Sequence, residues 1–383
     1  MNVRASIFLL CRPARSRRAR GSVLVIVLIT IVFAVTALVA FVEKAGDDLI
    51  VESREVTGHR LRQDAYSALE VTLAVLEQFR SVNSGLHSPA EGWSEPLEFA
   101  DWQPESGRIA EVSFEDESGK LSLPNVDAAT LLNLFESWEL PQADAERLTD
   151  SLLSWMRKDY VPATSRYTDY DQGATPYGPP LRSMRSYSEL AAIDFAREVF
   201  YDENGRPNER WHRFVDAVSL LDFKQSNINS GRTDVAAAFG VESLTQQRQL
   251  REFLEGTGGQ ARQGPGYFRD VAEAAALMGT GKLPQAYGTT ISALRINVTI
   301  REGRTTFRVS AVVAPSSGGA KVVDQVAETP KSSVSEAKER GKSPSPASST
   351  ASTATKKLNY PFTLLEIREN DEIPPVPVAE TEA

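Results

Sequence analysis

The sequence predicts an α+β protein in which one long N-terminal helix, part membrane-spanning and part stem, precedes a helix-rich head with a small antiparallel sheet. Three patterns support this fold class. Residues 22–42 carry no charge, residues 61–79 place apolar side chains at three- and four-residue steps, and residues 292–313 alternate apolar and polar side chains. The first two patterns are typical of helices and the third of a β-hairpin.

A basic N-terminus comes before the uncharged stretch. The first twenty residues contain six arginines and no acid, although the 383-residue chain has a net charge of -9. A basic tail can bind nucleic acid, but the apolar stretch that follows directly favours a membrane, so no nucleic-acid partner is expected. Residues 22–42 can cross the bilayer core, which takes about 20 helical residues. The positive-inside rule then predicts a single-pass protein of the inner membrane, with a cytoplasmic N-terminus and a periplasmic head.

Three kinds of targeting segment begin with a basic and then an apolar stretch. A secretory signal has an apolar core of about 7–15 residues and a cleavage site after it; this core is longer, and no such site follows. An uncleaved signal anchor fits the pattern. So does a short leader, residues 1–21, that is cut between Gly21 and Ser22 and leaves the apolar stretch on the mature chain. Gly21 alone does not separate these two, because glycine is also common where a helix begins.

The helical pattern continues past the uncharged stretch, so that residues 22–82 are expected to form a membrane helix and an amphipathic stem. No proline interrupts residues 22–79. Gly46 and Gly58 are the weak points, since each glycine costs about 1 kcal/mol relative to alanine inside a helix. The apolar side chains that share one face of the stem are Leu61, Ala65, Ala68, Leu69, Leu73, Leu76 and Phe79.

The head is expected over residues 83–314. Its first part predicts a strand at residues 108–114, and Asp127 is expected to cap the helix that follows. The segments 123–128 and 227–236 look alike, since each has a polar turn, a capping residue and the start of a helix. Helices are predicted at residues 127–138, 141–155, 188–201 and 268–278, and from residue 233 onward.

The end of the head predicts a hairpin that turns at Glu302-Gly303. Residues 315–358 are rich in serine, alanine, lysine and threonine and contain no aromatic residue, so they cannot bury a core and are expected to be disordered. Residues 359–373 are expected to return to the same sheet as a C-terminal strand, and residues 374–383 to form an acidic tail. The apolar residues of that strand are Phe362, Leu364 and Ile367.

Three stretches of the chain share the motifs of one family. They are Arg20-Gly21 before the apolar stretch, Asn227-Ile228-Asn229, and the block Glu115-Asp116-Glu117-Ser118-Gly119-Lys120-Leu121-Ser122-Leu123. Together they resemble the minor pseudopilin K family of type II secretion systems, from Arg20 to about Glu369. The block departs from the family pattern, because Leu121-Ser122-Leu123 replaces Asn-Leu-Asn. The acidic cluster expected after Trp155 is also mostly missing.

The resemblance implies processing, partners and a place of action. Prepilin peptidase would cut between Gly21 and Ser22, and Ser22 would be N-methylated. The mature chain would act at the pseudopilus tip, where it initiates or caps the filament with I- and J-type minor pseudopilins and the major pseudopilin and supports protein export across the outer membrane. Secreted cargo is a further partner. Ile26, the fifth mature residue, fits the tip, since ordinary pilins carry a glutamate there that is costly when unpaired in an apolar bundle.

Some relatives bind calcium through acidic loops. Here Asp159, Asp169 and Asp171 are the nearby acids, and a solvated loop is the favoured interpretation because surface acids are common. Otherwise no cofactor is expected.

No pattern in the sequence predicts an enzyme. The single cysteine, Cys11, lies in the leader, and no Gly-x-Ser-x-Gly motif is present. His59, His87 and His212 are far apart in the sequence, which leaves no spaced pair for a metal. Two alternatives stay open: a minor pilin of a type IV pilus or DNA-uptake machine, and a signal-anchored periplasmic protein of unknown activity.

Overall fold

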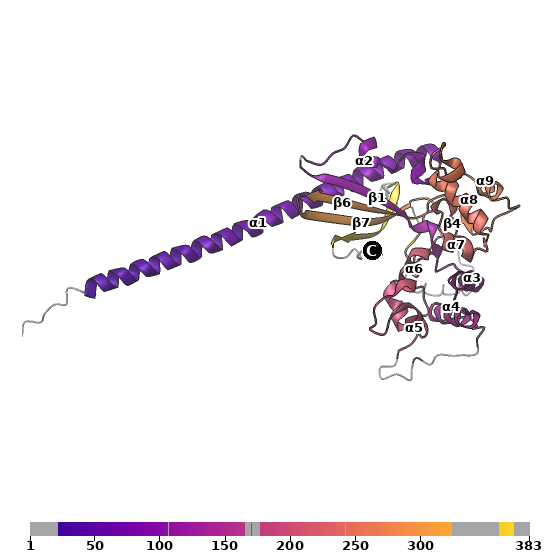
Figure 1. The fold of residues 1–383 in the computed structure, drawn as a ribbon, viewed down its shortest axis with the longest axis horizontal. Coiled ribbons are helices and arrows are strands. Elements are labelled where there is room, and N and C mark those ends of the chain that lie inside the picture. Colours follow the sequence, from indigo (N-terminus) through magenta and orange to yellow (C-terminus); the bar gives the residue numbers. More distant parts are fainter. Residues whose placement is uncertain are drawn as a thin grey trace, which may run out of the picture. The chain divides into compact units, whose positions relative to one another are not determined.

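The computed structural model describes residues 22–105, 107–164, 170, 177–241, 243–323 and 360–370 (Figure 1). The chain divides into two compact units, residues 1–60 and 61–383. The first unit contains the N-terminal part of helix α1. The second contains its C-terminal part, the sheet and the other helices, so the predicted α+β fold class is confirmed.

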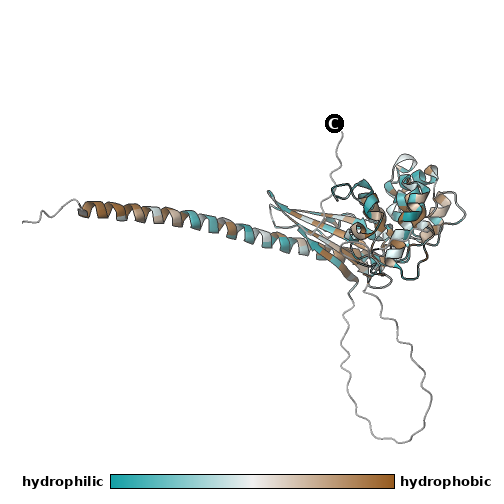
Figure 2. Cartoon of the chain, turned by 90° about the horizontal axis from the view of Figure 1, so that it is seen from below, coloured by the Kyte–Doolittle hydropathy of each residue, from teal (hydrophilic) through white to brown (hydrophobic). Residues whose placement is uncertain are grey.

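Helix α1 is one uninterrupted helix from Ser22 to Asn83. Gly46 and Gly58 do not break it, and an added Cβ would meet no atom within 4 Å at either position. Figure 2 shows its N-terminal part hydrophobic throughout, whereas polar and apolar residues mix farther along. The sequence predicts that the head begins at residue 83, but the second unit begins at Leu61, because the stem packs on the sheet from there onward.

The second unit contains a four-stranded antiparallel sheet in the order β1-β6-β7-β8. Its strands are β1 (Ile109–Asp116), β6 (Leu294–Glu302), β7 (Thr305–Pro315) and β8 (Phe362–Glu369). β6 and β7 form the predicted hairpin, and Gly303 in its turn has a φ of 59°, which favours glycine. The C-terminal strand returns to this sheet, as the sequence predicts, and it pairs with the outer side of β7.

The C-terminal part of α1 covers one face of this sheet. A helix presents one face every 3.6 residues and a strand every two residues, and the apolar residues of both follow these periods. Full burial of a large aliphatic side chain contributes about 1.5–3 kcal/mol. The fully buried residues that meet here include Leu61, Ala65, Ala68, Leu76, Ile296, Val298, Ile300, Val309 and Ala311.

A β-bulge in β8 explains why its apolar residues do not strictly alternate. Leu364 pairs with Val313 and Glu366 pairs with Val312, so Leu365 is an extra residue. The extra residue reverses the alternation, and Leu364 and Ile367 therefore both lie on the α1-facing side. Leu365 packs on the other side, against a small cluster of Phe223, Ala293, Val312 and Ala320.

The other helices of the second unit surround a second core, in which Phe135, Leu148, Phe200 and Phe214 are fully buried. These helices are α3 (Ala128–Ser137), α4 (Gln142–Met156), α5 (Ala196–Phe200), α6 (Glu209–Ala217), α7 (Thr233–Ala238), α8 (Leu244–Glu255) and α9 (Val271–Leu277), whereas the short α2 (Pro96–Phe99) packs on the sheet core. The predicted cap of α3 is confirmed, since Asp127 Oδ1 accepts a hydrogen bond from the N–H of Thr130 at 2.8 Å.

The likeness between the segments that precede α3 and α7 extends into the turns that end these helices. Glu139 after α3 has a φ of 60°, and Gly240 after α7 has a φ of 81°. A second helix follows each turn, α4 in one case and α8 in the other. α3 and α7 are also neighbours, because Asn133 Nδ2 donates to Ala238 O at 3.2 Å.

The predicted helix at residues 188–201 is not one helix. A 3-10 turn, Tyr187–Ala192, comes first, and α5 begins only at Ala196. Phe195 separates them with a φ of 60°, which interrupts helical geometry.

The first residues of the predicted disordered insert belong to the fold. Ala320 N donates to Ser292 O at 2.8 Å, and Lys321 exchanges backbone hydrogen bonds with Asp222. The bonded chain therefore continues past the predicted boundary at residue 315. Residues 324–358 of the predicted insert and the predicted tail lie outside the described residues.

Deletion of Leu365 tests the bulge. Without the extra residue, Leu364 still faces Val313 and Ile367 still faces Ala311, so both stay on the α1-facing side and the deletion removes only the contacts of Leu365. We expect the free energy of unfolding to fall by about 1–3 kcal/mol, measured by urea denaturation of the detergent-solubilised chain. Leu365→Ala keeps the residue count but removes the same side-chain contacts, so it should cost about as much. A much larger loss on deletion would contradict this account, because it would mean that the register of β8 depends on the extra residue.

Candidate functional site

The N-terminal part of α1 exposes apolar side chains in every direction. All side chains from Val23 to Val42 are exposed. Thr30 Oγ1 and Thr36 Oγ1 each donate to a carbonyl of their own helix at 2.8 Å, so these polar atoms are satisfied. A helix that is hydrophobic all round belongs in a protein core or a membrane. Among the described residues, one helix is long and apolar enough to cross a membrane, judged by length and composition.

The predicted processing site lies at the start of this helix. Ser22 is the first residue of α1, and Gly21 lies outside the described residues, so cleavage between them stays a prediction. Ile26 lies one turn farther on and is 60% exposed. Its tip-type role stays a prediction as well.

The block that resembles the K family lies where the sheet meets the helical core. β1 leads into a 3-10 turn, Glu117–Gly119, and β4 leads into a second one, Ile228–Ser230. Four two-residue strands flank these turns as the parallel pairs β2–β3 and β4–β5: β2 (Leu121–Ser122), β3 (Val218–Ser219), β4 (Ser226–Asn227) and β5 (Tyr287–Gly288). We name the two turns and the charged groups around them the junction, formed by Glu115, Asp116, Glu117, Ser118, Gly119, Lys120, Asn227, Asn229, Ser230, Arg232 and Arg295.

The two turns of the junction touch at Gly119 and Ser230. A Cβ on Gly119 would lie 2.3 Å from the Cβ of Ser230, far inside the separation that two carbon atoms tolerate. Ser230 Oγ donates to Gly119 O at 3.3 Å, and Ser226 Oγ donates to Lys120 O at 2.8 Å. Glycine is needed at position 119 because the backbone of one turn approaches the other so closely.

The two asparagines of the second family stretch tie the junction to its surroundings. Asn227 Nδ2 donates to Asp116 Oδ2 at 2.8 Å. Asn229 Nδ2 donates to Phe268 O at 3.0 Å and Thr289 O at 2.9 Å, and Asn229 Oδ1 accepts from the N–H of Phe268 at 2.7 Å. Buried polar groups need such partners, so these amides hold three separate segments in place.

Lys120 is buried between two carboxylates. Its Nζ lies 2.8 Å from Glu115 Oε1 and 3.1 Å from Glu117 Oε2, and the side chains of Lys120 and Glu117 are 4% and 5% exposed. Arg295 Nε lies 2.7 Å from Glu117 Oε1, and Arg232 Nη2 lies 3.3 Å from Glu115 Oε1. Removing one partner of a buried pair costs about 3–5 kcal/mol, because the other charge is left uncompensated.

The junction shifts the pKa values of two acids in opposite directions. Burial by itself raises the pKa of Glu117, but Lys120 and Arg295 outweigh it and hold that pKa below its ordinary value. Burial raises the pKa of Asp116 to about 6, although Ser118 and Asn227 donate hydrogen bonds to its carboxylate. Burial therefore prevails at Asp116, whereas the two cations prevail at Glu117.

Of the three predicted calcium ligands, Asp159 is exposed, and Asp169 and Asp171 lie outside the described residues. Calcium binding there stays a prediction. A different acid, Asp150 on α4, holds the start of this loop, since it accepts from Tyr160 Oη at 2.6 Å and from the N–H of Thr164 at 2.7 Å. Within the described ranges, no group of three or more His, Cys, Asp or Glu side chains is arranged to hold a metal ion.

The sequence places the histidines apart from one another, but His87 has a buried acidic partner. Its Nδ1 lies 2.7 Å from Glu91 Oε1, and Glu91 Oε2 accepts from Trp93 Nε1 at 2.9 Å. Burial raises the pKa of Glu91, but the hydrogen bonds from His87 and Trp93 outweigh it and leave that pKa lowered. The four-residue spacing of His87 and Glu91 was the available signal for this pair. Its contacts are those of a structural cluster.

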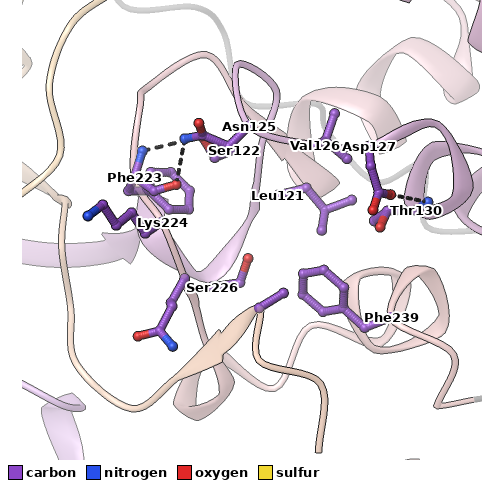
Figure 3. A pocket seen from close by; sticks show the side chains of 12 residues that line it. Leu121, Ser122, Asn125, Val126, Asp127, Thr130, Phe223, Lys224, Ser226 and Phe239 are labelled. Atoms are coloured by element: carbon purple, nitrogen blue, oxygen red, sulfur yellow. Dashed lines mark hydrogen bonds between the residues drawn. The ribbon is translucent and has the colours of Figure 1, made fainter.

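Two hollows border the junction. The larger, about 660 Å³, is lined by residues that include His87, Glu115, Asp116, Arg232 and Arg251. The smaller, about 100 Å³, includes Leu121 and Phe239 among its lining side chains, with Lys224 at its edge (Figure 3). In neither hollow is a described serine or threonine hydroxyl hydrogen-bonded to a histidine.

The comparisons with known proteins bear on the segment that contains the junction block. Residues 114–203 match the family model described as type II secretion system (T2SS), protein K, so the resemblance to the K family is confirmed over this stretch. The comparison with curated proteins gave no match. Among solved structures, the GspK-GspI-GspJ complex of the type 2 secretion system from enterotoxigenic Escherichia coli is similar, with a TM-score of 0.46 and 14% identity over 69% of this chain and 93% of that chain.

Gly119→Ala should separate the two turns of the junction. The new methyl group overlaps Ser230, so we expect the free energy of unfolding to fall by about 1–3 kcal/mol, measured by urea denaturation in detergent. Ser230→Gly in the same chain removes the overlapping atoms and should recover part of the loss. Gly281→Ala is the control, because its new Cβ meets no atom within 4 Å. An equal loss in the control would contradict the argument.

The raised pKa of Asp116 gives stability a pH dependence of definite sign. The folded chain holds the Asp116 proton more tightly than the unfolded chain, in which the pKa is about 3.9. The resulting stabilisation is complete below about pH 4 and is lost as the pH rises through about 6. The free energy of unfolding of the native chain minus that of Asp116→Asn should therefore fall between about pH 4.5 and pH 7 and then level off. A constant difference across that range would contradict the assignment.

Proposed function

We propose that the chain is a minor pseudopilin of a type II secretion system, with a structural role and no catalytic one. The observation that carries the proposal is an N-terminal helix that is apolar and exposed on all sides, followed in the same chain by a segment that matches the protein K family model. Such a helix must be placed in lipid or among other apolar helices. A filament subunit that starts in the inner membrane meets both environments in turn.

The internal bonding of the junction supports a structural role. Lys120, Glu117 and Arg295 neutralise one another, and the buried amides of Asn227 and Asn229 are bonded to the fold. Groups committed in this way hold elements together. They leave few polar atoms free to act on a substrate.

The place and partners that we propose follow from the family resemblance. The chain is anchored in the inner membrane with its second unit in the periplasm, and after assembly it lies at the pseudopilus tip. There it joins I- and J-type minor pseudopilins and the major pseudopilin, initiates or caps the filament, and supports the export of cargo. Ile26 supports the tip position, since it needs no ammonium partner from a subunit above it.

The processed N-terminus tests this function. We expect the chain purified from membranes of its native host to start at Ser22 with a methylated amine, as measured by N-terminal sequencing and intact mass. Gly21→Ala should leave the chain starting at Met1, because prepilin peptidase would lose the residue before its cut. Ala19→Gly, two residues upstream, is the control and should be processed normally.

Two outcomes would overturn the proposal. An unaltered chain that starts at Met1 would indicate a signal anchor, and a start beyond Val42 would indicate a secreted protein. Because type IV pilins are processed in the same way, protein export is assayed in the Gly21→Ala strain. Loss of export supports the secretion system, whereas loss of type IV pili alone would favour the other machine.

A further inference from the structure

The sheet ends at β8, whose outer edge has no described neighbour. β8 pairs with β7 on one side, from Phe362 to Glu369. In the part of the chain that the structure describes, no strand pairs with its other side. An edge of this length presents a row of backbone N–H and C=O groups to which another strand can bond.

Apolar side chains on β8 are exposed where those of its neighbour are buried. On the α1-facing side, Val309 and Ala311 of β7 are fully buried, whereas Leu364 and Ile367 are 53% and 38% exposed. α1 is hydrogen-bonded to β8 at Glu369, the last residue of the strand. The middle of β8 therefore keeps an apolar surface beside an unpaired edge.

The usual protections of an edge strand are weak in β8. Edges are commonly guarded by lysine, by proline or by short length, but β8 is eight residues long and contains neither residue. Glu366 and Arg368 form an ion pair with each other on the side away from α1. The bulge does not remove the apolar surface, since Leu365 is the residue that returns Ile367 to the α1-facing side.

The opposite edge strand, β1, is better covered. Val112 and Phe114 lie on its α1-facing side and are partly buried. Phe114 packs edge-on against Trp93, with ring centroids 4.9 Å apart. An unpaired edge and exposed apolar side chains on the α1-facing side thus coincide at β8 and not at β1.

We propose that β8 accepts an extended strand from a second subunit, whose backbone bonds to the outer edge of β8 and whose alternate apolar side chains cover Leu364 and Ile367. Strand addition fits both features, since main-chain hydrogen bonds supply affinity and alternate side chains supply specificity. The inference rests on the proposed function in its choice of partner, another membrane-anchored subunit of the same filament. Anchoring holds such a subunit at high local concentration.

A photo-crosslinking side chain on β8 tests the proposal. p-Benzoylphenylalanine replaces Leu364 in the full chain, in native-host cells that carry tagged I-type, J-type and major pseudopilins. The control position is Ile109 on β1, which is 62% exposed. We expect an adduct with one tagged subunit from position 364 and about tenfold less from position 109. Equal adducts from both positions, no adduct with a tagged subunit, or an adduct confined to the chain itself would overturn the proposal.

A second experiment places a charge on the edge of β8 and distinguishes failure of this inference from failure of the proposed function. Leu364→Lys should reduce the adduct formed from position 367 about fivefold or more, and Ile109→Lys should leave that adduct unchanged. Equal effects of the two lysines would contradict strand addition. The N-terminus is read on the same samples: a chain that starts at Ser22 and gives no adduct overturns strand addition alone, whereas a start at Met1 overturns the proposed function.

Discussion

The packing of one face of α1 on one face of the sheet is the constraint on which the rest of the second unit depends. The helix repeats every 3.6 residues and the strands every two, so their contact fixes which side chains of β6 and β7 point inward. The same contact also determines which strands of the sheet have side chains buried by α1. Ile296 and Val309 are fully buried, whereas Leu364 one strand farther out is half exposed. The same contact explains why the second unit begins at Leu61, within a continuous helix.

The junction joins this apolar sheet to a helical region with a core of its own, and it does so with charges. A buried ion pair contributes little net stability compared with apolar side chains of the same size. Lys120 between Glu115 and Glu117 does, however, require its partners at fixed distances. Gly119 adds a steric requirement, since the second turn fills the space that a side chain would occupy. We infer that the junction fixes the position of the two cores more than it adds to their stability.

Patterns with a local period were predictable from the sequence, and contacts between distant segments were not. The continuous α1, the β6–β7 hairpin and the Asp127 cap all follow from residues close together in the chain. Leu364 and Ile367 are three residues apart, which does not fit the two-residue period of a strand. The bulge that explains this step could not be predicted, because it depends on the pairing of β8 with β7. α8 was not separated from the helix predicted from residue 233 onward, since Leu250 is its one buried residue, which leaves no clear apolar stripe.

In the candidate site too, local motifs were predictable and contacts between distant residues were not. The block around Gly119 is recognisable as a family motif, and the matched segment bears this out. That the block is a buried junction depends on Ser230 and Arg295, which lie more than a hundred residues away in the sequence. The pairing of His87 with Glu91 is close in sequence, but it spans a 3-10 helix of three residues, Pro89–Glu91, which is too short to show a helical period.

The long connection between Pro315 and Phe362 has a consequence for the timing of biosynthesis. β1, β6 and β7 leave the ribosome before β8, and at about 5–20 residues per second the intervening stretch takes several seconds to synthesise. Pairing across so long a loop also forms later than a local hairpin, because the loop entropy is lost before the contact is gained. During that interval β7 is the outermost strand of the nascent sheet. The four-stranded sheet is therefore complete only after β8 has been synthesised and has paired with β7.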